Sequence, residues 1–285
     1  MTDGIILINK PSGITSFSAV NQIRKRLGVK CGHSGTLDPM ATGLLPIMCG
    51  KATKLCSYIT EGDKKYRATL RFGVETDTYD ITGNVTNTCE KQIHLKEILD
   101  VLPNFIGKIH QTPPAYSAIK VGGTALYKLA REGKEVKVPQ REITIYGIDI
   151  VDFSGKEIIM DVECSKGTYI RSLCVDIAKA VGTVGVMSSL TRLKSGKWTL
   201  DMAVELDCDN ISQHILSMDT VLDDYPPFKP GSFYSTLLSN GCAIDTKKLK
   251  NIPDGISRVY SDKLLGLGNV FEKDGVKYYK LLTHL

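Results

Sequence analysis

The sequence of 285 residues lacks the cysteine pairs and long apolar runs that define several large classes of protein. Its eight cysteines include no C-x-x-C pair, which indicates reduced thiols in a cytoplasmic protein rather than a zinc site or a disulfide scaffold. No apolar run approaches the roughly 20 residues that a membrane span needs. Residues 1–10 lack a basic segment, and the short apolar run Ile5–Ile8 predicts a strand rather than a signal peptide.

Familiar nucleotide-binding, hydrolase and metal-binding motifs are also missing. Gly50 and Lys51 look like the end of a phosphate loop, but Leu45 stands where such a loop requires its first glycine. Gly266 and Gly268 lack the third glycine of a dinucleotide-binding fingerprint, and no Gly-x-Ser-x-Gly elbow occurs. The histidines are far apart, with no carboxylate at ligand spacing, so we expect no bound metal. They are His33, His94, His110, His214 and His284.

The composition is that of an ordinary globular protein with an uneven distribution of charge. Hydrophobic residues make up 42% and charged residues 24%, which permits a core of normal size. Residues 1–54 hold seven basic and two acidic residues, and this excess equals the whole net charge of +5. Such asymmetry suits a polyanionic partner. A solvated basic helix face would explain the charge equally well.

Hydrophobic periodicity predicts both strands and helices, without a regular βαβ rhythm, and therefore an α+β fold. Ser16 is expected to cap a helix, and Tyr66–Val74 alternates as a half-buried strand. The apolar stripe of the first helix comprises Phe17, Val20, Ile23 and Leu27. Further helices are predicted at 95–102, 125–131 and 170–181, and strands at 142–152, 157–164, 256–260, 264–271 and 276–282.

The chain is expected to divide at the proline-rich residues 223–231, giving a large domain at 1–228 and a small β-rich domain at 229–285. Residues 32–50 are too irregular for one element and too apolar for a simple surface loop. Residues 107–140 are rich in glycine, proline and lysine and lack sustained periodicity. We expect this last segment to protrude or to be mobile.

One glycine-rich segment combines tight backbone with a single carboxylate. In Gly32–Pro46, Pro39 pushes Asp38 into an extended conformation, which can present the side chain at the mouth of a cleft. An Asp-Pro pair is more commonly a simple turn or helix start. In Cys164–Arg171 an aromatic and a guanidinium stand two residues apart. Arg171 is suited to hold a buried carboxylate in its charged form, or to form a surface salt bridge.

Five motifs together make the sequence similar to a known family. They are Asn9–Ser16, Gly32–Pro46, Tyr66-Arg67 with Thr76–Thr78 and Asp80, Pro114–Lys120, and Cys164–Arg171. In this order they resemble the tRNA pseudouridine synthase B (TruB) family, the pseudouridine-55 synthases. The resemblance implies a pseudouridine synthase fold, with a mixed, mainly antiparallel sheet flanked by helices and loops. Residues 229–285 resemble, more weakly, a small RNA-binding PUA domain.

The resemblance also implies roles for individual residues. Asp38 matches the family's catalytic aspartate, and Arg171 matches the arginine paired to it. Tyr66 matches the tyrosine that packs on the target uracil, and Leu190 matches an apolar residue of the pocket. The other matched residues contact RNA in the family: His33 stacks in it, Tyr169 contacts the substrate, and Lys54 is a basic position near it.

The implied reaction breaks the N1–C1′ bond of a uridine, turns the uracil and rejoins it through C5. Nothing is added overall, so no cofactor is expected, and the base must first be flipped out of its loop. Asp38 either attacks C1′ or removes the 2′ proton, and both routes stay open. Tyr66 is a candidate base for the C5 proton by elimination.

The expected partner is the T-arm loop of tRNA, bound by a monomer with no obligate protein partner. Lys120, Lys128 and Arg131 would contact phosphates. One alternative is an RNA-binding or RNA-folding protein in which catalysis is secondary. Another is a guide-RNA-dependent rRNA pseudouridine synthase, which the compact length and the lack of basic tails disfavour. A sugar-cleaving hydrolase is disfavoured because only one carboxylate is well placed.

Overall fold

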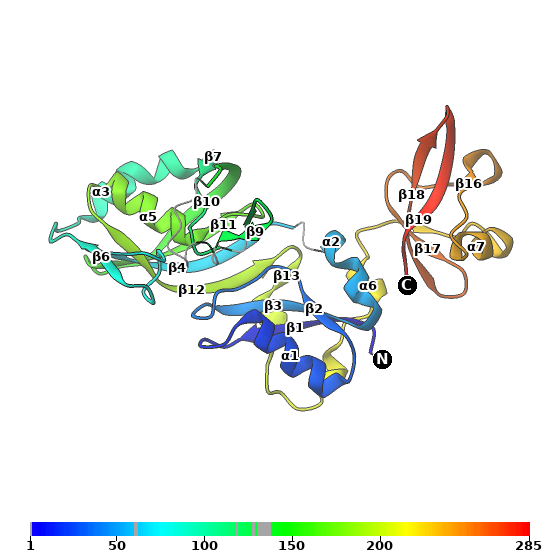
Figure 1. Ribbon diagram of the computed structural model, residues 1–285, viewed down its shortest axis with the longest axis horizontal. Coiled ribbons are helices and arrows are strands. Elements are labelled where there is room, and N and C mark those ends of the chain that lie inside the picture. Colours follow the sequence, from blue (N-terminus) through cyan, green and yellow to red (C-terminus); the bar gives the residue numbers. More distant parts are fainter. Residues whose placement is uncertain (1, 60–61, 118, 127–128, 130–137) are drawn as a thin grey trace.

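The computed structural model describes residues 2–59, 62–117, 119–126, 129 and 138–285. In this part of the chain ten strands form one sheet in the order β14–β1–β3–β12–β4–β11–β10–β7, with β2 paired to β3 and β13 to β12 (Figure 1). Among these pairs only β1–β14 and β3–β12 are parallel, which confirms the expected mixed, mainly antiparallel sheet. The strands are β1 (Gly4–Lys10), β2 (Cys31–His33), β3 (Thr42–Cys49), β4 (Lys64–Phe72), β7 (Gly107–Gln111), β10 (Arg141–Phe153), β11 (Glu157–Cys164), β12 (Gly185–Ser195), β13 (Trp198–Thr199) and β14 (Val204–Glu205).

The helices and short elements of this part lie around the sheet. The helix α5 (Ile170–Ala180) packs against β12 and β4, and its apolar face is buried as the sequence predicts. It ends at Ala180, and Gly182 two residues later takes a φ of +75°, which suits glycine. The other elements are α1 (Ser16–Leu27), η1 (Gly50–Leu55), α2 (Cys56–Ile59), β5 (Val74–Thr76), β6 (Val85–Thr88), α3 (Leu95–Val101), η2 (Leu102–Phe105), β8 (Lys120–Val121), β9 (Thr124–Ala125), η3 (Leu200–Met202), η4 (Ile211–His214) and α6 (Met218–Val221).

The strand β3 was not predicted as a separate element within residues 32–50. Seven of its eight residues are buried, because β1 and β12 flank it and side chains cover both faces. A strand buried on both faces shows no alternation, so periodicity does not reveal it. The turn between β2 and β3 carries Asp38, which places the candidate carboxylate just before a largely buried strand.

Helix α1 differs from the prediction at its start. The cap is Thr15 rather than Ser16, since the Thr15 hydroxyl accepts a hydrogen bond from the Ser18 amide at 3.0 Å. Ser16 is buried and joins the face formed by Ala19 and Ile23. Phe17 is 67% exposed, so its assignment to the apolar stripe was wrong. One residue along a helix turns the side chain by about 100°, which takes position 17 off the face of position 16.

Residues 107–140 also differ in part from the prediction. Residues 107–111 do not protrude, because β7 pairs with Arg141–Ile145 at the edge of the sheet. A short edge strand of this kind has too few residues to show a clear alternation of apolar and polar side chains in the sequence. The predicted helix at 125–131 lies mostly outside the described residues, as do Lys128 and Arg131. The strand at 66–74 ends at Phe72, where Gly73 takes a φ of +86°.

The C-terminal residues form a second sheet with its own core. Within residues 227–284, all of them described, five strands pair in the order β15–β17–β18–β19–β16 (Figure 1). Its elements are β15 (Pro227–Phe228), α7 (Ser232–Ser239), β16 (Ile244–Asp245), η5 (Thr246–Lys248), β17 (Ser257–Tyr260), β18 (Leu264–Lys273) and β19 (Val276–His284). Among the described helices, none is long and apolar enough to cross a membrane.

The two sheets are joined by apolar and polar contacts. Leu267 of β18 is fully buried and belongs to the same apolar cluster as Val221 and Leu222. Lys54 donates from Nζ to the carbonyl oxygen of His284 at 2.7 Å. Arg258 donates from Nε to the carbonyl oxygen of Tyr225 at 2.8 Å. Removing the C-terminal sheet would therefore expose apolar surface of the remaining chain.

Candidate active site

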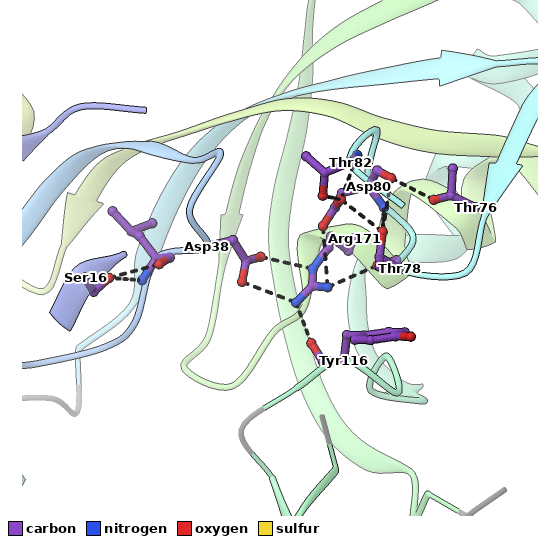
Figure 2. A network of polar contacts seen from close by, with 9 residues as sticks. Ser16, Asp38, Thr76, Thr78, Asp80, Thr82, Tyr116 and Arg171 are labelled. Carbon is purple, nitrogen blue, oxygen red and sulfur yellow. Dashed lines mark hydrogen bonds and ion pairs between the residues drawn. The ribbon is translucent and has the colours of Figure 1, made fainter. Parts of the chain in front are cut away.

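The centre of the candidate site is a carboxylate gripped by a guanidinium. Arg171 lies in the first turn of α5, and its Nε is 3.0 Å from Asp38 Oδ2, while its Nη2 is 3.3 Å from Oδ1 (Figure 2). This is the two-pronged geometry in which arginine binds carboxylates most strongly. The Asp38 side chain keeps 32% of its surface exposed, whereas Arg171 keeps 7%. The carboxylate is thus held by Arg171 on one side, and part of its surface is accessible to solvent.

A second carboxylate shares the same guanidinium. Asp80 Oδ2 lies 3.6 Å from Arg171 Nη1, and the side chain of Asp80 is buried. The other oxygen of Asp80 accepts hydrogen bonds from Thr78 Oγ1 and from the amide and hydroxyl of Thr82 (Figure 2). Arg171 also donates to the carbonyl oxygens of Thr78 and Tyr116, both at 3.0 Å. Every nitrogen of the guanidinium is therefore held.

The surroundings of Asp38 shift its pKa upward. Burial is the largest cause, because a charged carboxylate is poorly solvated there. Arg171 lowers the pKa, Asp80 raises it again, and Lys10 lowers it. Arg171 therefore acts in the direction that favours the carboxylate form of Asp38.

The segment 10–16 holds the turn that carries Asp38. Ser16 is 1% exposed, and its hydroxyl donates to the Leu37 carbonyl at 2.9 Å and accepts from the Leu37 amide at 2.8 Å (Figure 2). Lys10 is fully buried, and burial lowers its pKa to about 8. Its ammonium donates to the carbonyl oxygens of Pro11, Ile14 and Pro39. The backbone on both sides of Asp38 is thus tied to one segment.

Tyr66 and Leu190 lie on the neighbouring strands β4 and β12. Leu190 pairs with Ala68 and is buried, while Tyr66 is partly buried and packs against the same apolar core. Burial raises the pKa of the Tyr66 phenol, and the charge of Arg192 acts against this shift. Asp38 is near enough to raise that pKa as well. The structure therefore brings Asp38, Arg171, Tyr66 and Leu190 into one region.

His33 and Tyr169 border this region from two other elements. His33 is in β2, and burial, aided by the charge of Arg192, lowers its pKa and favours a neutral ring. Tyr169 caps α5, and its amide and carbonyl are held by the side chain of Gln111 at 2.8 and 2.9 Å. The Arg141 guanidinium lies 5.8 Å from the Tyr169 ring centre. The backbone of His33 is thus held in a strand, and that of Tyr169 is held at the start of a helix.

Lys54 has a hydrogen-bond partner that the sequence did not predict, and its expected place near the RNA stays a prediction. It lies in η1, and its ammonium is bound to the carbonyl oxygen of His284 in the C-terminal sheet. This interaction gives Lys54 a role in joining the two sheets, which the sequence did not predict. The two residues are more than two hundred positions apart in the sequence, so no local sequence pattern could predict this hydrogen bond.

Three residues of the site received no role from the sequence. Lys10 and Asp80 both lie within recognised motifs, but their partners are distant in the chain. Arg192 follows Leu190 by two positions on β12 and is 1% exposed. The sequence signal that could have revealed Arg192 was a charged residue within an alternating strand that is largely buried. In the described residues no group of three or more His, Cys, Asp or Glu could hold a metal ion.

Comparison with known proteins agrees with this geometry. The family model described as "TruB family pseudouridylate synthase (N terminal domain)" matches residues 23–170. The tRNA pseudouridine synthase B of Clostridium kluyveri is 44% identical, covering 93% of this chain and 95% of its own length. That of Clostridium acetobutylicum is 42% identical, covering 99% of this chain and 100% of its own.

Solved structures show the same fold at lower identity. A chain of a Cbf5–Nop10–Gar1 complex has a TM-score of 0.72 and 23% identity, covering 97% of this chain and 83% of its own. A chain of an archaeal box H/ACA Nop10–Cbf5 complex has a TM-score of 0.71 and 21% identity, covering 99% and 86%. Fold and relatives together define a pseudouridine synthase, an isomerase that converts uridine to pseudouridine. The chain belongs to the TruB family.

Proposed function

We propose that this enzyme converts uridine 55 in the T-loop of tRNA to pseudouridine. The observation that carries the proposal is Asp38, open on one side and held on the other by the two-pronged grip of Arg171. The relatives named tRNA pseudouridine synthase B support tRNA as the substrate. The reaction needs one carboxylate aimed at the sugar of a flipped uridine, and this arrangement supplies one.

Asp38 acts on the ribose in the first half of the reaction. Its carboxylate attacks C1′ or removes the 2′ proton, and either route breaks the N1–C1′ bond and frees the uracil from the ribose. The uracil then turns between Tyr66 and Leu190 and bonds to C1′ through C5. His33 fills the space that the flipped base leaves, since a neutral ring stacks well among bases.

Tyr66 acts in the second half, when C5 must lose its proton. The proton goes to the phenolate oxygen of Tyr66, and the C5–H electron pair forms the C5=C6 double bond. The electron pair of the N1=C6 double bond moves to N1, which takes up a proton from water. Tyr66 returns its proton to water, so the reaction has no net proton change and needs no cofactor.

A direct test uses the purified protein alone with an unmodified tRNA transcript, followed by mapping of pseudouridine. We expect modification at position 55 without any guide RNA or second protein. A requirement for guide RNA would instead favour the ribosomal alternative, for which the Cbf5 structures supply a likeness of fold. We further propose that the enzyme is a monomer, because the site is built from one chain, and that it acts in the cytoplasm.

Replacing Tyr66 by Phe is expected to lower the single-turnover rate by roughly 10²–10⁴-fold, the usual contribution of a proton-transfer group. The ring is kept, so tRNA binding should change by less than about threefold. Tyr66→Ala should weaken binding as well, because stacking is removed. Single-turnover rates measured at saturating tRNA distinguish a role of Tyr66 in proton transfer from a role in packing alone. Equal rates for the wild type and Tyr66→Phe would leave Tyr66 with a packing role only.

The proposal also assigns residues 229–285 to RNA binding, as a PUA-like domain beside a catalytic domain at 1–228. Residues 231–285 hold eight basic and five acidic residues. Lys273, Lys277 and Lys280 are exposed on the β18–β19 hairpin. Ion pairs between such lysines and phosphates strengthen binding in a salt-dependent way.

Replacing these three lysines by Gln is expected to weaken tRNA binding and to reduce its salt dependence by about one unit of slope for each phosphate that is no longer neutralised. The rate at saturating tRNA should stay the same, since the proposed catalytic residues lie outside the C-terminal sheet. Filter binding across a salt series measures the effect. The matched control is Glu272→Gln on the same hairpin, which should not weaken binding. Unchanged affinity in the triple variant would show that this hairpin does not bind tRNA.

A further inference from the structure

The site contains two buried guanidiniums, and only one of them has carboxylate partners in the described residues. Arg171 lies between Asp38 and Asp80. Arg192 is among the largest fully buried side chains, and its hydrogen bonds include two to backbone carbonyl oxygens. Its Nε donates to Leu44 at 2.7 Å, and its Nη2 donates to Gly35 at 3.1 Å. Burying a cation without an anionic partner costs free energy, so the burial of Arg192 needs a functional explanation.

The position of Arg192 is fixed by the sheet and by the catalytic turn. It pairs with Tyr66 across the β12–β4 ladder, so the two side chains leave neighbouring backbones. Leu44 belongs to β3, and Gly35 belongs to the turn that leads to Asp38. A Cβ at Gly35 would stand 3.3 Å from Arg192 Nη1, so the turn closes tightly over the guanidinium. The charge therefore has little freedom to move.

The phenol of Tyr66 is the group on which this fixed charge can act. Arg192 stands opposite Tyr66 in the ladder and brings a positive charge near the phenol, which lowers the pKa of Tyr66. The other charged or titratable groups that influence it are Asp38 and Cys164, and both favour the neutral phenol. Burial acts in the same direction as these two. Arg192 thus supplies the stabilisation of a phenolate at this position.

We propose that Arg192 is a positioning residue that acts through Tyr66, stabilising the phenolate form of Tyr66 that then takes the proton from C5. The inference rests on the proposed role of Tyr66. It gives the two guanidiniums different tasks, because Arg171 serves the carboxylate of the first half-reaction and Arg192 serves the phenol of the second.

The test is a double-mutant cycle between Arg192→Met and Tyr66→Phe, with single-turnover rates at saturating tRNA. In the wild-type background we expect Arg192→Met to lower the rate by about a hundredfold. In the Tyr66→Phe background the same change should cost less than about threefold, because the phenol is already gone. tRNA binding should change by less than about threefold in all variants. Arg192→Lys keeps the charge and should restore much of the rate.

A control separates this role from general damage to the strand. Thr191→Val removes the hydroxyl that bonds to the Thr42 hydroxyl at 2.8 Å, next to Arg192 on β12. Its effect should be small and equal in both backgrounds. If Arg192→Met does not fold, as judged by thermal unfolding, the cycle is run with Arg192→Lys, whose smaller loss should also vanish with Tyr66→Phe.

Two results would overturn the inference without touching the proposed function. One is the same fold-loss for the Arg192 variant in both backgrounds. The other is a full rate for Arg192→Met in the wild-type background. If Tyr66→Phe is as fast as the wild type, the role of Tyr66 fails and the inference fails with it. Absence of pseudouridine with the wild-type enzyme would instead contradict the proposed function itself.

Discussion

Replacing Asp38 by Asn is expected to abolish isomerisation, while tRNA binding should stay within about tenfold of the wild type, or about 1.4 kcal/mol. The amide keeps the shape of the side chain but has neither the charge to attack C1′ nor the basicity to take the 2′ proton. Pseudouridine mapping after long incubation measures the loss, and filter binding measures the affinity. Measurable turnover by a preparation free of wild-type enzyme would remove Asp38 from its role.

A matched control is available on the surface of the ten-stranded sheet, where β4 and β11 pair. Asp161 forms the same two-pronged pair with Arg67, at 2.7 and 3.0 Å, but Arg67 is about half exposed. Asp161→Asn removes a carboxylate from an arginine without entering the site. Exposed pairs contribute about 0–1 kcal/mol, so stability and rate should both be nearly unchanged. A large effect of this control would mean that loss of any such pair impairs the enzyme.

The sequence predicted those parts of the fold whose patterns are local. The amphipathic stripe of residues 170–181 appears as α5, and the alternating strands at 142–152 and 157–164 appear as β10 and β11. The strand β3 was missed because burial on both faces removes the alternation. The choice between Thr15 and Ser16 as helix cap depended on where Leu37 lies, which no local pattern contains.

For the site, as for the fold, the sequence predicted only the features that local motifs reveal. Motifs marked Asp38 and Arg171, and the structure brings these two residues within hydrogen-bond distance. The roles of Asp80 and Arg192 depend on the packing of distant elements around one guanidinium or one phenol. Such roles are properties of the tertiary arrangement, so a sequence pattern can name the residues but not their partners.

Replacing Arg171 by Met is expected to lower the single-turnover rate by about 10²–10³-fold, as loss of one fixed electrostatic partner commonly does. The change leaves two carboxylates, Asp38 and Asp80, without their shared cation. Breaking a buried pair in this way costs about 3–5 kcal/mol, so the free energy of unfolding should also fall. Urea denaturation measures this second effect. If the variant does not fold, Arg171→Lys carries the test instead.

Arg171→Lys keeps the charge but cannot grip Asp38 with two nitrogens. Arg171 holds the pKa of Asp38 down against burial and Asp80, so the pKa should rise further in this variant. In the proposed mechanism the ionised carboxylate is the active form, so a higher pKa of Asp38 means that activity is lost at a higher pH as the solution is acidified. The acid limb of the rate profile should therefore move upward. Adding Asp80→Asn removes the charge that raises this pKa, and the limb should move back. An acid limb that is the same in all three proteins would show that Asp38 ionises independently of Arg171 and Asp80.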